Sequence, residues 1–158
     1  MATTPEVAIA SRLLVAAADR LFVAAEGLDT EELNWSPFSN ASSISALGLH
    51  VIGATRENVL THICRIADSD RIRATEFERS EETGSSLAAR WAALRPEIEA
   101  ALEALHAEAL DAPRNHQTFG EVSARELLLR LVGHVYEHAA HAELTHQLLE
   151  ERRQNIPA

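Results

Sequence analysis

Three histidines near the C-terminus have a spacing that points directly to chemistry. His134, His138 and His141 follow one another at intervals of four and three residues, which places them on one face of an α-helix. The same stripe continues on either side through Leu127, Leu131, Thr145 and Leu148. Because leucines stand at both ends of the stripe, we expect it to face the core of the protein.

Imidazole rings in an apolar interior need partners for their nitrogens. An unpaired ring costs free energy there, and protonated rings would repel one another. A divalent cation removes both penalties, because it takes a lone pair from each neutral ring. His134 and His138 lie one helical turn apart, about 6 Å between Cβ atoms, so both can bind one ion. This pair therefore predicts a helical metal clamp.

A third ligand must come from another helix, and His50 is the best-placed candidate. It follows an apolar run near the start of its predicted helix, which could face the last helix in an antiparallel bundle. For His50 alone, ordinary core packing remains the favoured alternative. The other histidines are weaker candidates: His62, His106, His116 and His146. Cys64, with no evident base beside it, is expected to act as a small apolar residue.

Four helices must position these side chains. Apolar periodicity and capping residues predict them at about 5–27, 43–67, 85–110 and 123–151. Pro96 is expected to kink or split the third helix, and residues 68–84 and 111–122 are expected to be loops. The prediction is an all-α four-helix bundle forming a single domain over residues 1–158.

Local signals mark the connections. Asp29 with Glu32, and Ser123 with Glu126, have the spacing of capping boxes. Trp35 and Phe38 are expected to pack the first connection against the core. The tail from residue 154 onward is expected to fray.

Composition excludes several classes of protein. Hydrophobic residues make up 46% and charged residues 24%, as in globular domains. The net charge of −10 argues against a nucleic-acid partner. We find no apolar run of the roughly 18 residues that a membrane span needs, and no signal peptide. With Cys64 as the single cysteine, we expect a cytoplasmic protein.

Three segments together resemble the DinB-like (YfiT-like) metalloenzyme superfamily. Residues 26–37 read EGLDTEELNWSP, residues 42–50 read SSISALGLH, and residues 134–141 read HVYEHAAH. The first two resemble the family's first connection and the start of its second helix, and the third resembles its His-x-x-x-His-x-Gly-Gln motif. Ala140 and His141 depart from that motif, while Ala140 to Leu144 resemble the His-Ala-Asp-Leu variant of an actinobacterial subgroup.

The resemblance implies a site and a chemistry. It assigns His50, His134 and His138 to a divalent metal, often zinc or nickel. A register starting at His138 would put Ala142 in the second ligand position and is rejected. Characterised relatives include transferases and isomerases that use a low-molecular-weight thiol such as mycothiol or bacillithiol.

We therefore expect a metal-dependent enzyme that transfers or adds such a thiol to a small electrophile. His141 is its candidate catalytic proton carrier, since histidine exchanges protons near neutral pH. The alternative is a non-enzymatic divalent-metal-binding stress protein. A homodimer is also expected, through a surface that includes Trp91 and Ala92.

Overall fold

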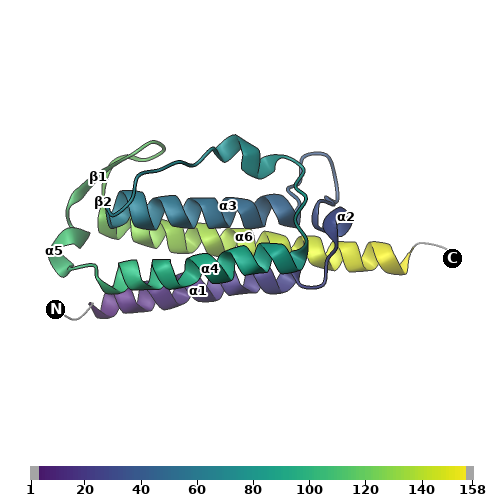
Figure 1. The fold of residues 1–158 in the computed structure, drawn as a ribbon, viewed down its shortest axis with the longest axis horizontal. Helices are drawn as coiled ribbons and strands as arrows, with labels where there is room; N and C mark the ends of the chain where they lie inside the picture. Colours follow the sequence, from purple (N-terminus) through teal and green to yellow (C-terminus); the bar gives the residue numbers. More distant parts are fainter. Residues whose placement is uncertain (1–3, 156–158) are drawn as a thin grey trace.

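Four long helices run side by side in the computed structural model, which describes residues 4–155 (Figure 1). They are α1 (Pro5–Ala25), α3 (Ile44–Arg56), α4 (Gly84–Glu103) and α6 (Ala124–Gln154). α1 packs against α4 and α6, and α3 packs against the same two helices. Their leucine, isoleucine and alanine side chains form one core. The predicted all-α four-helix bundle is confirmed.

The first connection is short and capped as predicted. Gly27, with a φ of +76°, ends the first helical segment, and α2 (Thr30–Leu33) follows. Asp29 and Glu32 form the predicted capping box over this single turn. Trp35 packs against the core, but Phe38 is 66% exposed, so the prediction was wrong for Phe38.

The second connection is long because α3 and α4 run in the same direction (Figure 1). The chain must return along the bundle between them, over residues 64–83. Within this crossover lies η2, a 3₁₀-helix at Arg73–Phe77 that packs against α3. The sequence predicted a loop here and did not reveal this turn, because it is too short to show periodicity.

The second predicted helix changes character before it ends. α3 continues into η1 (Glu57–Ile63), a π-helix with i→i+5 hydrogen bonding that closes with Cys64 N donating to Val59 O at 2.8 Å. The wider turn rotates the side chains of η1 relative to those of a continued α-helix. The regular structure ends at Ile63, not at the predicted residue 67.

The third predicted helix breaks at a different place from the one expected. α4 continues without interruption through Pro96 and ends at Glu103, and α5 (Ala107–Leu110) follows as a separate turn. Leu94 and Ile98, on either side of the proline, are buried in the core and hold the helix together there.

Residues 111–122 form a hairpin where the sequence predicted a loop. β1 (Pro113–His116) pairs antiparallel with β2 (Gly120–Ser123). The buried guanidinium of Arg114 donates to the carbonyl oxygen of Ile63 at 3.1 Å. This bond ties the hairpin to the end of η1, a tertiary contact that local sequence does not encode.

α6 begins at the predicted cap, where Ser123 Oγ accepts a hydrogen bond from Glu126 N at 3.1 Å. The Glu126 carboxylate pairs with Arg130 instead of closing a capping box. At the other end Gln154 is still helical, and residues 156–158 lie outside the described part of the chain.

Trp91 is not available for a surface between copies of the chain. It is 3% exposed, stacks on Phe22 and donates from Nε1 to Asp19. Ala92 is exposed, and the homodimer stays a prediction. None of the helices between residues 4 and 155 has an apolar stretch long enough to cross a bilayer.

Candidate metal centre

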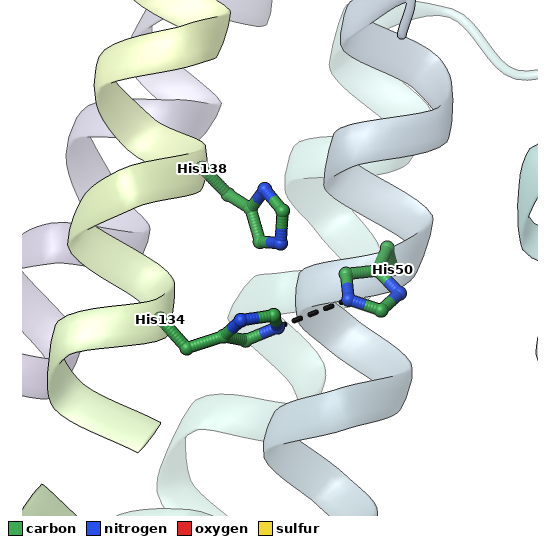
Figure 2. A group of neighbouring side chains, drawn as sticks. All are labelled: His50, His134 and His138. Atoms are coloured by element: carbon green, nitrogen blue, oxygen red, sulfur yellow. Dashed lines mark hydrogen bonds between the residues drawn. The ribbon is translucent and has the colours of Figure 1, made fainter. Parts of the chain in front are cut away.

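Three histidines from two neighbouring helices converge between α3 and α6, at the edge of the core. His134 and His138 project from α6 toward His50 on α3 (Figure 2). One ring nitrogen from each lies within 4.8 Å of the others. The i,i+4 spacing on a regular helix brings the two α6 rings together, with centroids 4.3 Å apart.

The stripe that predicted this clamp lies at the edge of the core. His134 and His138 are half-buried, whereas His141 and Leu148 are exposed. The innermost positions of α6 are their neighbours, including Val135, Ala139, Ala142 and Leu149. The stripe was therefore wrongly expected to face the core along its whole length, because packing between α6 and α1 sets the buried face.

His138 has no partner of its own in this arrangement. Both of its ring nitrogens are buried and accept or donate no hydrogen bond within residues 4–155. A buried unsatisfied polar atom costs about 1–3 kcal/mol. A cation bound between the three rings would satisfy one of these nitrogens, so the residues fit a divalent metal.

His50 is oriented by a carboxylate behind it. The Nδ1 atom of His50 lies 2.9 Å from Oε2 of Glu76, a residue only 7% exposed. Arg71 also lies 3.2 Å from Nδ1, but a guanidinium only donates, so Nδ1 cannot serve both. The shorter contact to an acceptor-only carboxylate makes Nδ1–H the donor. The lone pair of His50 is then on Nε2, which faces His134.

Glu76 is itself held by a buried ion-pair network. Arg71 donates to both carboxylate oxygens of Glu76, at 2.6 and 2.8 Å, and to Glu57 at 2.8 Å. The carboxylate approaches the backbone of α3 at Gly53, where a Cβ atom would lie 2.2 Å from Oε1. Glycine at this position makes room for the Glu76 side chain.

Electrostatics keep the three rings neutral. Burial, followed by repulsion from neighbouring imidazoles and guanidinium groups, lowers the pKa of His134 to about 4 and that of His138 to about 4. Burial also lowers the pKa of His50, against the opposing effect of Glu76. Neutral imidazoles at pH 7 have the free lone pairs that metal binding requires.

The distances also suit one ion. Nε2 of His50 and Nε2 of His134 are 3.0 Å apart (Figure 2). Two nitrogens on a tetrahedral zinc, each about 2.0–2.1 Å from the metal, would be about 3.3 Å apart. Three neutral nitrogens leave a coordination position free, which is typical of catalytic rather than structural sites.

A cavity of about 330 Å³ adjoins this centre. It begins at His50 and His134, and its walls include Ala54, Leu127 and Leu131. Its other end is formed by η1 and the hairpin. Its size is within the range of sites for small molecules.

The remaining histidines do not join the three-histidine group. His141 is exposed, His106 is exposed at the start of α5, and His146 donates from Nδ1 to Ala24 O at 2.7 Å. His62 and His116, weak candidates from sequence, line the far end of the cavity. Burial raises the pKa of the half-buried Cys64 thiol to about 11, which agrees with an inert apolar role.

Sequence reasoning missed the residues that the crossover and the hairpin bring to the site. Glu76 and Arg71 lie in the segment expected to be an aperiodic loop, and nothing local marks them. Arg130, on α6, lines the cavity together with Arg71 and Arg73. The cavity therefore has positive charges of its own beside any metal.

The sequence of this chain matches a known protein family over most of its length. The family model of the DinB superfamily matches residues 13–142, and the protein belongs to that superfamily.

The crystal structure of a conserved protein from Enterococcus faecalis has the same fold, with a TM-score of 0.72 and 15% sequence identity. The match covers 90% of this chain and 96% of that one. No curated protein matches the sequence.

Proposed function

We propose that the protein is a divalent-metal-dependent enzyme that transfers or adds a low-molecular-weight thiol to a small electrophile. The observation that carries the proposal is the convergence of three neutral histidines beside a cavity of about 330 Å³. A zinc or nickel ion is the proposed cofactor. The residues that would hold it are His50, His134 and His138.

The histidines supply neutral ligands and leave room for a co-substrate. A divalent ion bound there would lower the pKa of a coordinated thiol, so that the thiolate is available at neutral pH. Glu76 holds the His50 ring with its Nε2 lone pair toward the site. Leu127, Leu131 and Ala54 offer apolar walls that exclude water around the second substrate.

The nucleophile has to come from a co-substrate. Cys64 is the one cysteine of the chain, and its thiol has a pKa of about 11 because of burial. It is therefore protonated at neutral pH and is a poor nucleophile. We propose that His141, one helical turn beyond His138 and open to solvent, exchanges the proton that the thiol releases.

The test is a thiol titration of the cobalt-substituted protein. Mycothiol and bacillithiol are added in turn, and a sulfur-to-cobalt charge-transfer band is expected with at least one of them. The metal-stripped protein and the His134→Ala variant should give no band. A spectrum that does not change with either thiol would contradict the thiol-transfer proposal. Metal binding without thiol binding would instead favour the non-enzymatic metal-binding protein.

A further inference from the structure

The end of the cavity away from the metal centre is built by irregular elements. His62 comes from the π-helix η1, and His116 to Phe119 come from the end of β1 and the turn of the hairpin. The His62 and His116 rings meet edge to face, with centroids 5.1 Å apart. Neither residue belongs to the three-histidine centre.

A three-layer stack holds a guanidinium at this end. The His116 ring stacks on Phe119, with centroids 4.8 Å apart and planes 17° apart. The Arg130 guanidinium lies over the Phe119 ring, 4.5 Å from its centroid. Glu126 holds Arg130 from outside the cavity, with Nε donating to Oε1 at 2.8 Å. The stack explains why an aromatic ring that is 42% exposed is kept in place.

The hairpin also fixes the tautomer of His116. The backbone N–H of Thr118 donates to Nδ1 of His116 at 3.2 Å, so Nδ1 carries a lone pair. Burial, followed by repulsion from His62, lowers the pKa of His116, which favours the neutral ring. The proton of the neutral ring is then on Nε2. Within residues 4–155, no hydrogen-bond acceptor pairs with this Nε2–H.

The charge around the cavity is positive, although the whole chain has a net charge of −10. Arg71, Arg73 and Arg130 line it, and Glu57 is the one lining carboxylate among the described residues. Arg71 neutralises Glu57 at 2.8 Å. Arg73 lies over the Phe77 ring and forms no ion pair with a carboxylate in the described part of the chain. Arg130 is paired with Glu126, so the charge that no carboxylate of the described residues compensates comes from Arg73.

We propose that the cavity binds an oxyanion, the carboxylate or phosphate group of the electrophilic substrate, between Arg73 and the stack that holds Arg130. Arg73 lies on the metal-centre side, over the Phe77 ring, whose centroid lies 5.3 Å from that of His50. Arg73 supplies the unpaired charge, Arg130 supplies guanidinium N–H donors, and His116 Nε2–H supplies a further directional donor. A second metal site is a poorer fit, because Glu57 is already bound by Ser69 and Arg71. The assignment of the anion to the electrophilic substrate rests on the proposed function. Binding of the anion itself can be measured without any catalytic turnover.

The experiment measures binding of three matched probes to the zinc-loaded protein by calorimetry. Benzoate and phenyl phosphate are the anionic probes, and benzamide is the neutral one. At least one anion should bind at least tenfold more tightly than benzamide. Because a hydrogen bond to a charged group contributes about 1.5–3 kcal/mol, Arg130→Gln and Arg73→Gln should each weaken that anion about tenfold or more. Comparing benzoate with phenyl phosphate identifies the preferred oxyanion.

The control is Arg90→Gln, which removes a surface guanidinium paired with Glu82 outside this cavity and should leave anion binding unchanged. Phe119→Ala removes the ring between His116 and Arg130 and should weaken the anion while zinc stoichiometry is kept. Zinc stoichiometry and circular dichroism show that each variant is folded.

Two results would overturn the proposed oxyanion subsite. One is equal binding of benzamide and both anions. The other is anion binding that survives both arginine substitutions and disappears in His134→Ala, which would place the anion on the metal. Anion binding that depends on the arginines, together with an unchanging cobalt spectrum, would reject thiol transfer and keep the subsite.

Discussion

The two histidine groups of this protein are built in opposite ways. His50, His134 and His138 stand on the regular parts of two long helices, with a buried carboxylate behind one of them. His62 and His116 stand on a π-helix and a hairpin strand, with an aromatic–guanidinium stack beside them. The first group offers lone pairs that converge on a point. The second offers the Nε2–H of His116 beside the Arg130 guanidinium, at the other end of the cavity.

In this small bundle, regular helices position one histidine group, and a π-helix and a hairpin position the other. Converging lone pairs need close positional control, which packed helices provide. Recognition of a second substrate depends on loops and hairpins, which can vary without disturbing the core. We expect substitutions in the first group to abolish metal binding and those in the second to change what is bound beside the metal.

The largest expected effect is the loss of the metal itself. His50→Ala, His134→Ala and His138→Ala each remove one of the three proposed ligands, so each should reduce bound zinc from about one equivalent to a small fraction. Elemental analysis of protein purified without a His tag measures this. His62→Ala and His116→Ala are the matched controls and should keep full stoichiometry. If all three variants kept one equivalent of zinc, the assignment of these histidines as metal ligands would be wrong.

A smaller effect is expected from the residue behind His50. Glu76→Ala removes the acceptor of His50 Nδ1–H, and loss of such a partner weakens metal affinity about 10–100-fold. Competition with a chromogenic chelator measures the affinity, and ¹⁵N shifts of the metal-free protein report the tautomer of His50. Glu78→Ala, an exposed neighbour on the same segment, is the control.

Gly53→Ala tests the same network without removing a polar side chain. Its Cβ would meet Glu76 Oε1 at 2.2 Å and displace the carboxylate. Affinity should fall in the same direction as in Glu76→Ala. An unchanged metal affinity in both variants would show that Glu76 does not position the His50 ring.

The stability of the metal-free protein should depend on the neutral histidines. The pKa values of His134 and His138 are about 4 in the folded protein, against about 6.5 for a free histidine. Between these values the unfolded chain binds more protons, so stability should fall as the pH drops from about 6.5 to about 4. The slope is up to about 1.4 kcal/mol per pH unit for each histidine.

Urea unfolding at a series of pH values measures this slope. The double variant His134→Gln, His138→Gln should have a flatter profile. His106→Gln, at an exposed position, is the control. A profile in which the double variant and the wild-type protein fall equally would contradict the burial of neutral rings.

The smallest expected effect is on metal binding after a change at His141. This side chain is exposed and lies outside the three-histidine group, so His141→Gln should leave zinc stoichiometry unchanged. The proposed proton-carrier role predicts slower thiol consumption in the same variant. Release of the metal would make His141 a ligand and would require a different register of the motif.

Much of the fold could be predicted because the helices encode it locally. The cap at Ser123, the capping box at Asp29 and the apolar periodicity are patterns within a few residues of one another. The i,i+4 pair on α6 is equally local, since helix geometry alone brings His134 beside His138. The proximity of His50 followed from the antiparallel arrangement of α3 and α6 (Figure 1).

The rest of the site depends on contacts between residues far apart in the chain. Glu76 reaches His50 because the crossover folds back over α3 and Gly53 leaves space for it. The hairpin carries His116 to His62 because Arg114 binds the last carbonyl group of η1. Such contacts leave no periodic signal, because their geometry exists only when separate segments pack together. Amino-acid order thus determined the helices and the proximity of His134 to His138, while tertiary packing selected the residue that orients His50 and the charges that line the cavity.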